Sequence, residues 1–140
     1  MAYRDVPRHE EIKHHMTQHP DRVTDVSIRL WESMASEIIS LVGTGGFISL
    51  YARSLFLVRP SLPWLVMDAA PADKSHRFEQ LKTTLAGQSP EHARAANIML
   101  LITFTDILAA LIGDPLTTSI LGTAWGNTAS DTADKESKNE

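Results

Sequence analysis

The fold of this chain follows most directly from residues 20–43, which read PDRVTDVSIRLWESMASEIISLVG. Apolar residues recur here every three or four positions, which is the spacing of one face of an α-helix. A proline near the start and a glycine at the end are typical of the two ends of a helix. We therefore expect a long amphipathic helix that stops at Gly43. Its apolar stripe consists of Val26, Leu30, Met34, Ile38 and Leu41.

Start and stop signals of the same kind predict further helices along the chain. Ser89 followed by Pro90 is the clearest start, because serine caps a helix and proline fits its first turn. Thr44-Gly45-Gly46 is expected to be a turn between two helices. Residues 60–65 hold two prolines and three large apolar side chains, so they should cross the bundle as a non-helical strap. The expected helices cover residues 7–18, 21–42, 47–58, 73–86, 90–112 and 114–125.

Length and composition favour one domain. The chain has 140 residues, of which 43% are hydrophobic and 21% are charged, and this suffices for a single core. We expect an all-α, single-domain helical bundle of five or six helices over residues 20–126. Residues 1–19 are expected to form a flexible N-terminal arm or a short helix. The polar residues 127–140 are expected to be a disordered tail.

Residues 28–51 and 98–121 read alike at an offset of 70 positions. Each segment contains a long apolar helix, two aliphatic residues and a glycine, a polar turn and the start of a shorter helix. We expect two pseudo-repeated helix hairpins that cover each other's apolar faces. The alternative is a chance match between amphipathic helices. The matched residues are Ile28 with Ile98, Leu30 with Leu100, Met34 with Phe104, Ile38 with Leu108, Leu41 with Leu111, Val42 with Ile112 and Gly43 with Gly113.

Charge and cysteine content point to the compartment and argue against some partners. The formal net charge of −4 does not favour nucleic acid, which proteins bind through basic surfaces. The chain has no cysteine and no apolar leader in its first twenty residues, so we expect it in the cytoplasm. The longest apolar stretch, residues 98–112, is shorter than the roughly 20 residues of a membrane span, so no membrane partner is expected.

Histidines supply two candidate sites. His15 and His19 lie four positions apart, a spacing that can hold a metal on a helix, but we expect no metal because no third ligand follows a known pattern. His76 and His92 are candidate phosphoacceptors, since phosphotransfer domains carry an exposed histidine on a helical bundle. No acidic residue follows His76 and no Lys-Gly follows His92. The alternative for both is an ordinary surface histidine.

Asp106 lies inside an apolar segment, so its carboxylate must face water, a cation or a hydrogen-bond donor. We expect it to be exposed or paired with an arginine such as Arg53. Alternatively, Asp106 and Arg53 orient a small molecule in an apolar cavity that has Phe47 and Tyr51 in its wall.

No complete catalytic set is visible in the sequence, so neither an enzyme nor a cofactor is expected. The leading hypothesis is a non-catalytic regulatory or adaptor domain that acts through protein–protein interaction. We expect a homodimer with Trp64, Leu65 and Trp125 at its interface. The alternatives are a small-molecule-sensing helical bundle with an apolar cavity and a component of a histidine phosphorelay.

Overall fold

The computed structural model describes residues 7–65 and 77–126. This part of the chain contains five α-helices, a closing π-helical turn and no strand. The predicted all-α bundle is thus confirmed, while the predicted tail at 127–140 lies outside the described residues. The elements are α1 (Pro7–Thr17), α2 (Val23–Val58), α3 (Glu79–Ala86), α4 (Pro90–Ile112), α5 (Asp114–Leu121) and η2 (Gly122–Gly126).

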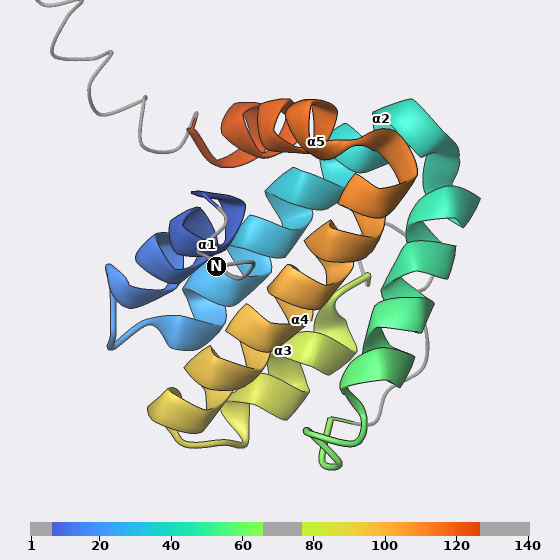
Figure 1. Ribbon diagram of the computed structural model, residues 1–140. Helices are drawn as coiled ribbons and strands as arrows, with labels where there is room; N and C mark the ends of the chain where they lie inside the picture. Colours follow the sequence, from blue (N-terminus) through green and yellow to red (C-terminus); the bar gives the residue numbers. More distant parts are fainter. Residues whose placement is uncertain (1–6, 66–76, 127–140) are drawn as a thin grey trace, which may run out of the picture.

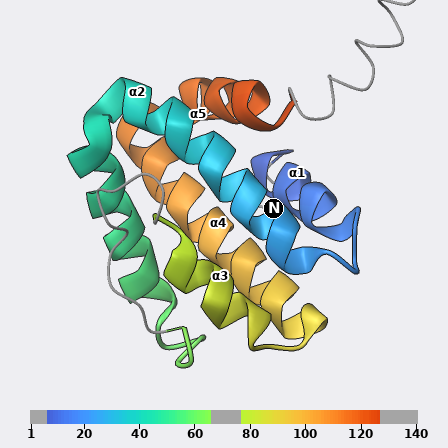
Figure 2. The ribbon, with the colours of Figure 1, turned by 180° about the vertical axis from the view of Figure 1, so that it is seen from behind.

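Two long helices form the centre of the bundle. The first half of α2 and the whole of α4 lie side by side and run in the same direction (Figures 1 and 2). α1 packs mainly against α4, and α3 packs mainly against α2. α5 and η2 cross α2 at the end of the bundle where α4 finishes (Figure 1).

Each long helix changes direction at a glycine. Gly43 has φ 86° and ψ 164°, and Gly113 has φ 96° and ψ 152°. This region of backbone space is essentially open to glycine alone, because a Cβ atom would clash there. The predicted stops at Gly43 and Gly113 are therefore confirmed. The predicted turn at Thr44-Gly45-Gly46 is wrong, because these residues are helical and Gly43 alone takes up the bend.

The sequence match between the two halves extends to their structure. Positions 21–40 and 91–110 are buried, half-buried or exposed in the same order, with the pair Glu32 and Ile102 as the one exception. The bends at Gly43 and Gly113 also share one backbone conformation. The predicted pseudo-repeat is therefore a structural repeat, in which two kinked segments pack through equivalent faces.

Aromatic rings fill the space between the long helices. Neighbouring ring centroids in this cluster lie 5.2 to 6.1 Å apart, the distances at which aromatic pairs stabilise a core. All five side chains of the cluster are buried. They are Trp31, Phe47, Tyr51, Phe78 and Phe104.

The N-terminal segment is a docked helix. Ile12 and Met16, its two apolar anchors, are fully buried against the bundle. Residues 7–17 are therefore not a flexible arm, and of the two alternatives for this segment the short helix is correct. The amphipathic pattern of α1 is weak because part of its buried face is polar, as the contacts of Arg8 show below.

Candidate functional site

The apolar stripes of the two long helices continue beyond the core. In α2 and α4 the stripe residues are buried until the last turn before the glycine, where Leu41 is 51% exposed and Leu111 is 65% exposed. These leucines are repeat partners, and both lie at the end of the bundle where α2 bends and α4 finishes (Figure 1). The core residues next to them remain buried, and the two leucines continue the apolar stripes onto the surface at this end. The buried members are Leu30, Met34 and Ile38 in α2 and Leu100, Phe104 and Leu108 in α4.

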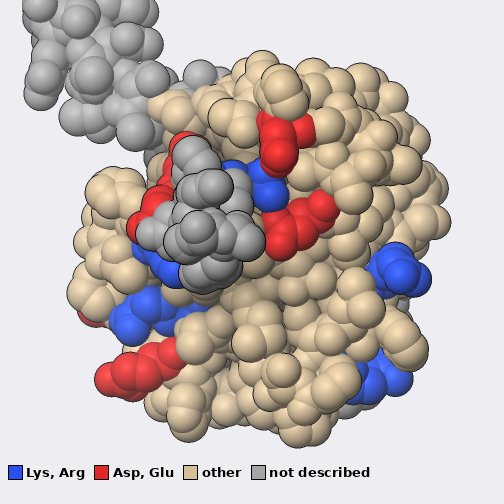
Figure 3. All heavy atoms as spheres, in the orientation of Figure 1, with Lys and Arg blue, Asp and Glu red and all other residues tan. Residues whose placement is uncertain are grey.

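Leu116 adds a third exposed side chain near the same place. It lies in the first turn of α5, three residues after Gly113, and is 43% exposed. The sequence has no charged residue from 38 to 52, and Asp114 is the only one from 107 to 121. On the face drawn in Figure 3, the upper right of the molecule, over the bend of α2, is uncharged, while an acidic side chain lies over α5 and basic side chains lie over the second half of α2. We call Leu41, Leu111 and Leu116 the bend surface.

Beside the bend surface, a buried arginine joins three helices. Arg8 of α1 donates from Nη2 to Oδ1 of Asp106 at 2.6 Å and from Nη1 to Oδ1 of Asp114 at 2.5 Å. Asp106 belongs to α4 and Asp114 begins α5, so one guanidinium contacts both sides of Gly113. We call these contacts the Arg8 bracket.

The contacts of Arg8 favour the charged form of its guanidinium. Burial lowers the pKa of Arg8, but its hydrogen bonds and ion pairs with Asp106 and Asp114 outweigh this effect and raise the pKa above its ordinary value. His9 adds a third contact, because its Nε2 lies 2.7 Å from Oδ1 of Asp106. The expectation that Asp106 is exposed or paired is thus met, but its partner is Arg8 and not Arg53.

A second histidine of α1 packs against the C-terminal end of the described chain. The ring of His15 lies edge-on to that of Trp125, with 5.5 Å between centroids, and its Nε2 is 3.6 Å from Glu11. Burial lowers the pKa of His15, and Glu11 offsets this only in part. His19 is exposed, and the described residues hold no group of three or more His, Cys, Asp or Glu that could bind a metal.

Of the four residues considered for a ligand cavity, only Phe47 and Tyr51 are brought together, with ring centroids 5.8 Å apart. Phe47 and Tyr51 are buried in the aromatic cluster, and burial raises the pKa of the Tyr51 hydroxyl. Arg53 is exposed on the second half of α2. Asp106 points into the Arg8 bracket. The rings of Phe78 and Phe104 fill the space beside Phe47.

The predicted interface residues differ in exposure. Trp64 is half-buried, whereas Leu65 and Trp125 are buried in the core of the chain itself. Nε1 of Trp125 donates a 3.0 Å hydrogen bond to the carbonyl oxygen of Leu30, which ties η2 to α2. Leu65 and Trp125 therefore belong to the interior and cannot form a docking surface in this conformation.

Of the two candidate phosphoacceptors, His76 lies outside the described residues. His92 is exposed in the first turn of α4. Its backbone N–H donates a 3.2 Å hydrogen bond to Oγ of Ser89, so the predicted serine cap is confirmed.

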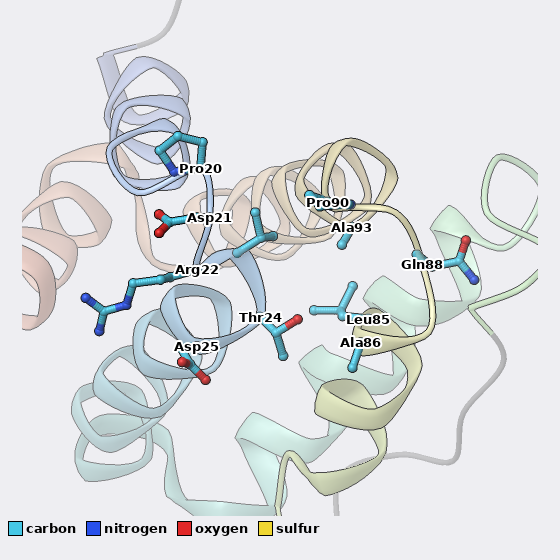
Figure 4. Close-up of a pocket in the computed structure, with 11 residues that line it drawn as sticks. Pro20, Asp21, Arg22, Thr24, Asp25, Leu85, Ala86, Gln88, Pro90 and Ala93 are labelled. Carbon is cyan, nitrogen blue, oxygen red and sulfur yellow. The ribbon is translucent and has the colours of Figure 1, made fainter.

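One surface pocket of about 270 Å³ lies at the other end of the long helices, and the sequence did not predict it. It forms where the start of α2 meets the turn between α3 and α4 (Figure 4). Thr24 and Leu85 lie on facing sides of this pocket, while the side chains of Asp21 and Arg22 point away from Leu85 (Figure 4). The pocket is open, and its exposed lining is more polar than apolar.

Comparison with protein-family models, curated proteins and solved structures found no match to this chain. By length and composition, α2 and α4 could each cross a membrane. Their most apolar 18 residues have mean hydropathies of 1.5 and 2.0, and 33% and 39% of those residues are buried in the bundle. Core helices of soluble proteins meet the same criteria.

Proposed function

We propose that this chain is a non-catalytic regulatory or adaptor domain that acts through protein–protein interaction and forms a homodimer through the bend surface. One observation carries the proposal: the repeat partners Leu41 and Leu111 continue two buried stripes and are 51% and 65% exposed. Fully burying a leucine contributes about 1.5–3 kcal/mol, so exposed leucines that continue a core onto the surface favour association.

A second copy of the chain is the partner that this surface fits best. Leu41 and Leu111 are repeat partners on parallel helices, whereas Leu116 matches Gly46 and has no leucine partner. Homodimers pair the same patch on both copies, so an apolar patch of this kind can cover itself. Asp114, the one charged residue from 107 to 121, is already paired with Arg8, so two copies can meet without repulsion between like charges.

The proposal also covers compartment and partners. The absence of cysteine and the net charge of −4 suit a cytoplasmic protein with no nucleic-acid partner. Neither a membrane partner nor a cofactor is part of the proposed function.

Sedimentation velocity of the full chain tests this proposal. We expect the wild-type chain to be a dimer and the double variant Leu41→Gln/Leu111→Gln to be a monomer with an unchanged far-UV circular dichroism spectrum. The matched control is Phe56→Gln/Leu57→Gln, which changes two exposed apolar residues on the second half of α2 and should remain a dimer. A monomeric wild-type chain, or dissociation of the control alone, would refute the proposed interface.

A further inference from the structure

We propose that the Arg8 bracket regulates the bend surface: Arg8 sets the angle between α4 and the start of α5, and release of α1 loosens the start of α5, while Trp125 still ties its far end to α2, and weakens the dimer. This inference rests on the proposed function for its effect on dimerisation. Its structural part, the control of α5 by Arg8, can be tested without it.

The bracket spans a joint made of one residue. Gly113 alone separates α4 from α5, and a glycine without a Cβ atom restricts the backbone least. Leu111 and Leu116 lie two residues before and three residues after this joint. The angle between α4 and α5 at Gly113 therefore sets the position of Leu116 relative to Leu111.

Arg8 is suited to fixing that angle. Its guanidinium is planar and rigid. Nη1 and Nη2 contact Asp114 and Asp106 simultaneously, so the two carboxylates are held in a fixed position relative to each other. Within the joint, Thr117 contacts the carbonyl oxygen of Gly113 through its backbone N–H and its Oγ1, at 3.1 and 2.8 Å. Both of these hydrogen bonds lie within the first turn of α5 and do not reach α4. Among the described residues, the two ion pairs of Arg8 are the side-chain ion pairs that link α4 to α5.

In the other half of the repeat, the residues at the three matching positions cannot form such a bracket. Seventy positions after Arg8 stands Phe78, which is buried in the aromatic cluster beside the long helices. At the Gly43 bend, the positions that match Asp106 and Asp114 are Ser36 and Thr44. These three residues carry no charge, so the polar contacts of Arg8 are a departure from an otherwise repeated arrangement.

The energetics of the bracket favour a regulatory role over a purely stabilising one. Both carboxylates of the bracket are partly exposed, and ion pairs that reach solvent contribute little net stability. Nε of Arg8 is buried and has no hydrogen-bond partner among the described residues, which adds to the cost. Asp106 and Asp114 are exposed, so water and solutes reach both carboxylates.

α1 is a short element with few apolar anchors. It is only 11 residues long, and two apolar side chains, Ile12 and Met16, anchor it in the core. Short elements with few buried contacts open locally at a lower free energy than the central helices. Opening of α1 would withdraw Arg8 from both aspartates in one step.

Hydrogen exchange of the full chain, followed by mass spectrometry, tests the bracket. Arg8→Met keeps an apolar stem in the buried site while removing both donors, and Arg53→Gln is the control on an exposed arginine. Because Arg8→Met removes two hydrogen bonds to charged groups, we expect it to speed exchange in both α1 and α5 by on the order of tenfold. Exchange in α3 should stay unchanged, and the dimer dissociation constant should rise by a similar factor.

Three outcomes are distinguishable. Faster exchange in α1 with unchanged exchange in α5 would overturn the bracket, because Arg8 would then only anchor its own helix. Faster exchange in both helices with an unchanged dissociation constant would overturn the coupling to the dimer. If the wild-type chain is monomeric, the proposed function fails, and a joint rise in α1 and α5 would still establish the control of α5 by Arg8.

Discussion

Nε1 of Trp31 donates a 2.7 Å hydrogen bond to Oδ1 of Asn97, which joins the first half of α2 to α4 inside the core. Both side chains are buried, so neither group can turn to water if its partner is removed. We expect Asn97→Leu to lower the free energy of unfolding by about 1–3 kcal/mol, the cost of a buried donor without an acceptor. Urea denaturation of Asn97→Leu, Trp31→Phe and the double variant measures the coupling, and strictly additive losses would contradict it.

Met16 is predicted to dock α1 onto both halves of the repeat. Its Sδ accepts from Nδ2 of Asn97 at 3.2 Å and from Oγ of Ser27 at 3.8 Å, and Ser27 and Asn97 are repeat partners. We expect Met16→Ala to cost about 2–5 kcal/mol, because it leaves a cavity in the core. The exposed neighbour Lys13→Ala should change stability by less than about 0.5 kcal/mol. Equal melting temperatures for the two variants would mean that α1 is not docked.

The two bends should be sensitive to an added methyl group. We expect Gly43→Ala and Gly113→Ala each to destabilise the chain by about 1–3 kcal/mol, because alanine does not readily adopt their backbone conformation. Gly45→Ala is the matched control: Gly45 is helical, and no atom lies within 4 Å of the Cβ it would gain. Alanine there should be neutral or stabilise the helix by up to about 1 kcal/mol. Denaturant titrations that rank Gly45→Ala as the most damaging of the three would rule out the bend.

His15 predicts a loss of stability in mild acid. Burial lowers its pKa below the ordinary value of 6.5, with Glu11 and His14 as the charged or titratable neighbours that modify it. At pH values between the lowered pKa of the folded chain and the ordinary pKa of the unfolded chain, the unfolded chain binds more protons than the folded chain. The free energy of unfolding must therefore fall as the pH drops through this window. His15→Gln should flatten this part of the pH profile, whereas His92→Gln, at an exposed site, should not. An unaltered slope in His15→Gln would contradict the assignment.

Local patterns in the sequence predicted much of the fold. The stripe ending at Leu41, the serine cap at Ser89 and the stops at Gly43 and Gly113 depend on residues a few positions apart. Thr44-Gly45-Gly46 misled the prediction, because a glycine-rich stretch is typical of a turn even where one glycine makes the whole bend.

The contacts that define the site could not be predicted in this way. Arg8 and Asp106 are 98 positions apart, and no spacing rule links them. Trp125 looked like an interface residue because its hydrogen bond to Leu30, 95 positions away, is invisible in the sequence. Leu41 shares a stripe with buried residues, so periodicity alone predicts that it is buried. Its exposure follows only from where the neighbouring helices end.

Disulfide cross-linking tests the central claim, a homodimer through the bend surface, most directly, because the chain has no cysteine of its own. Single variants Leu41→Cys, Leu111→Cys and the control Phe56→Cys would be oxidised in dilute solution and separated on a non-reducing gel. We expect covalent dimers from position 41 or 111 and none from position 56. Dimers from position 56 alone, or from no position, would contradict it.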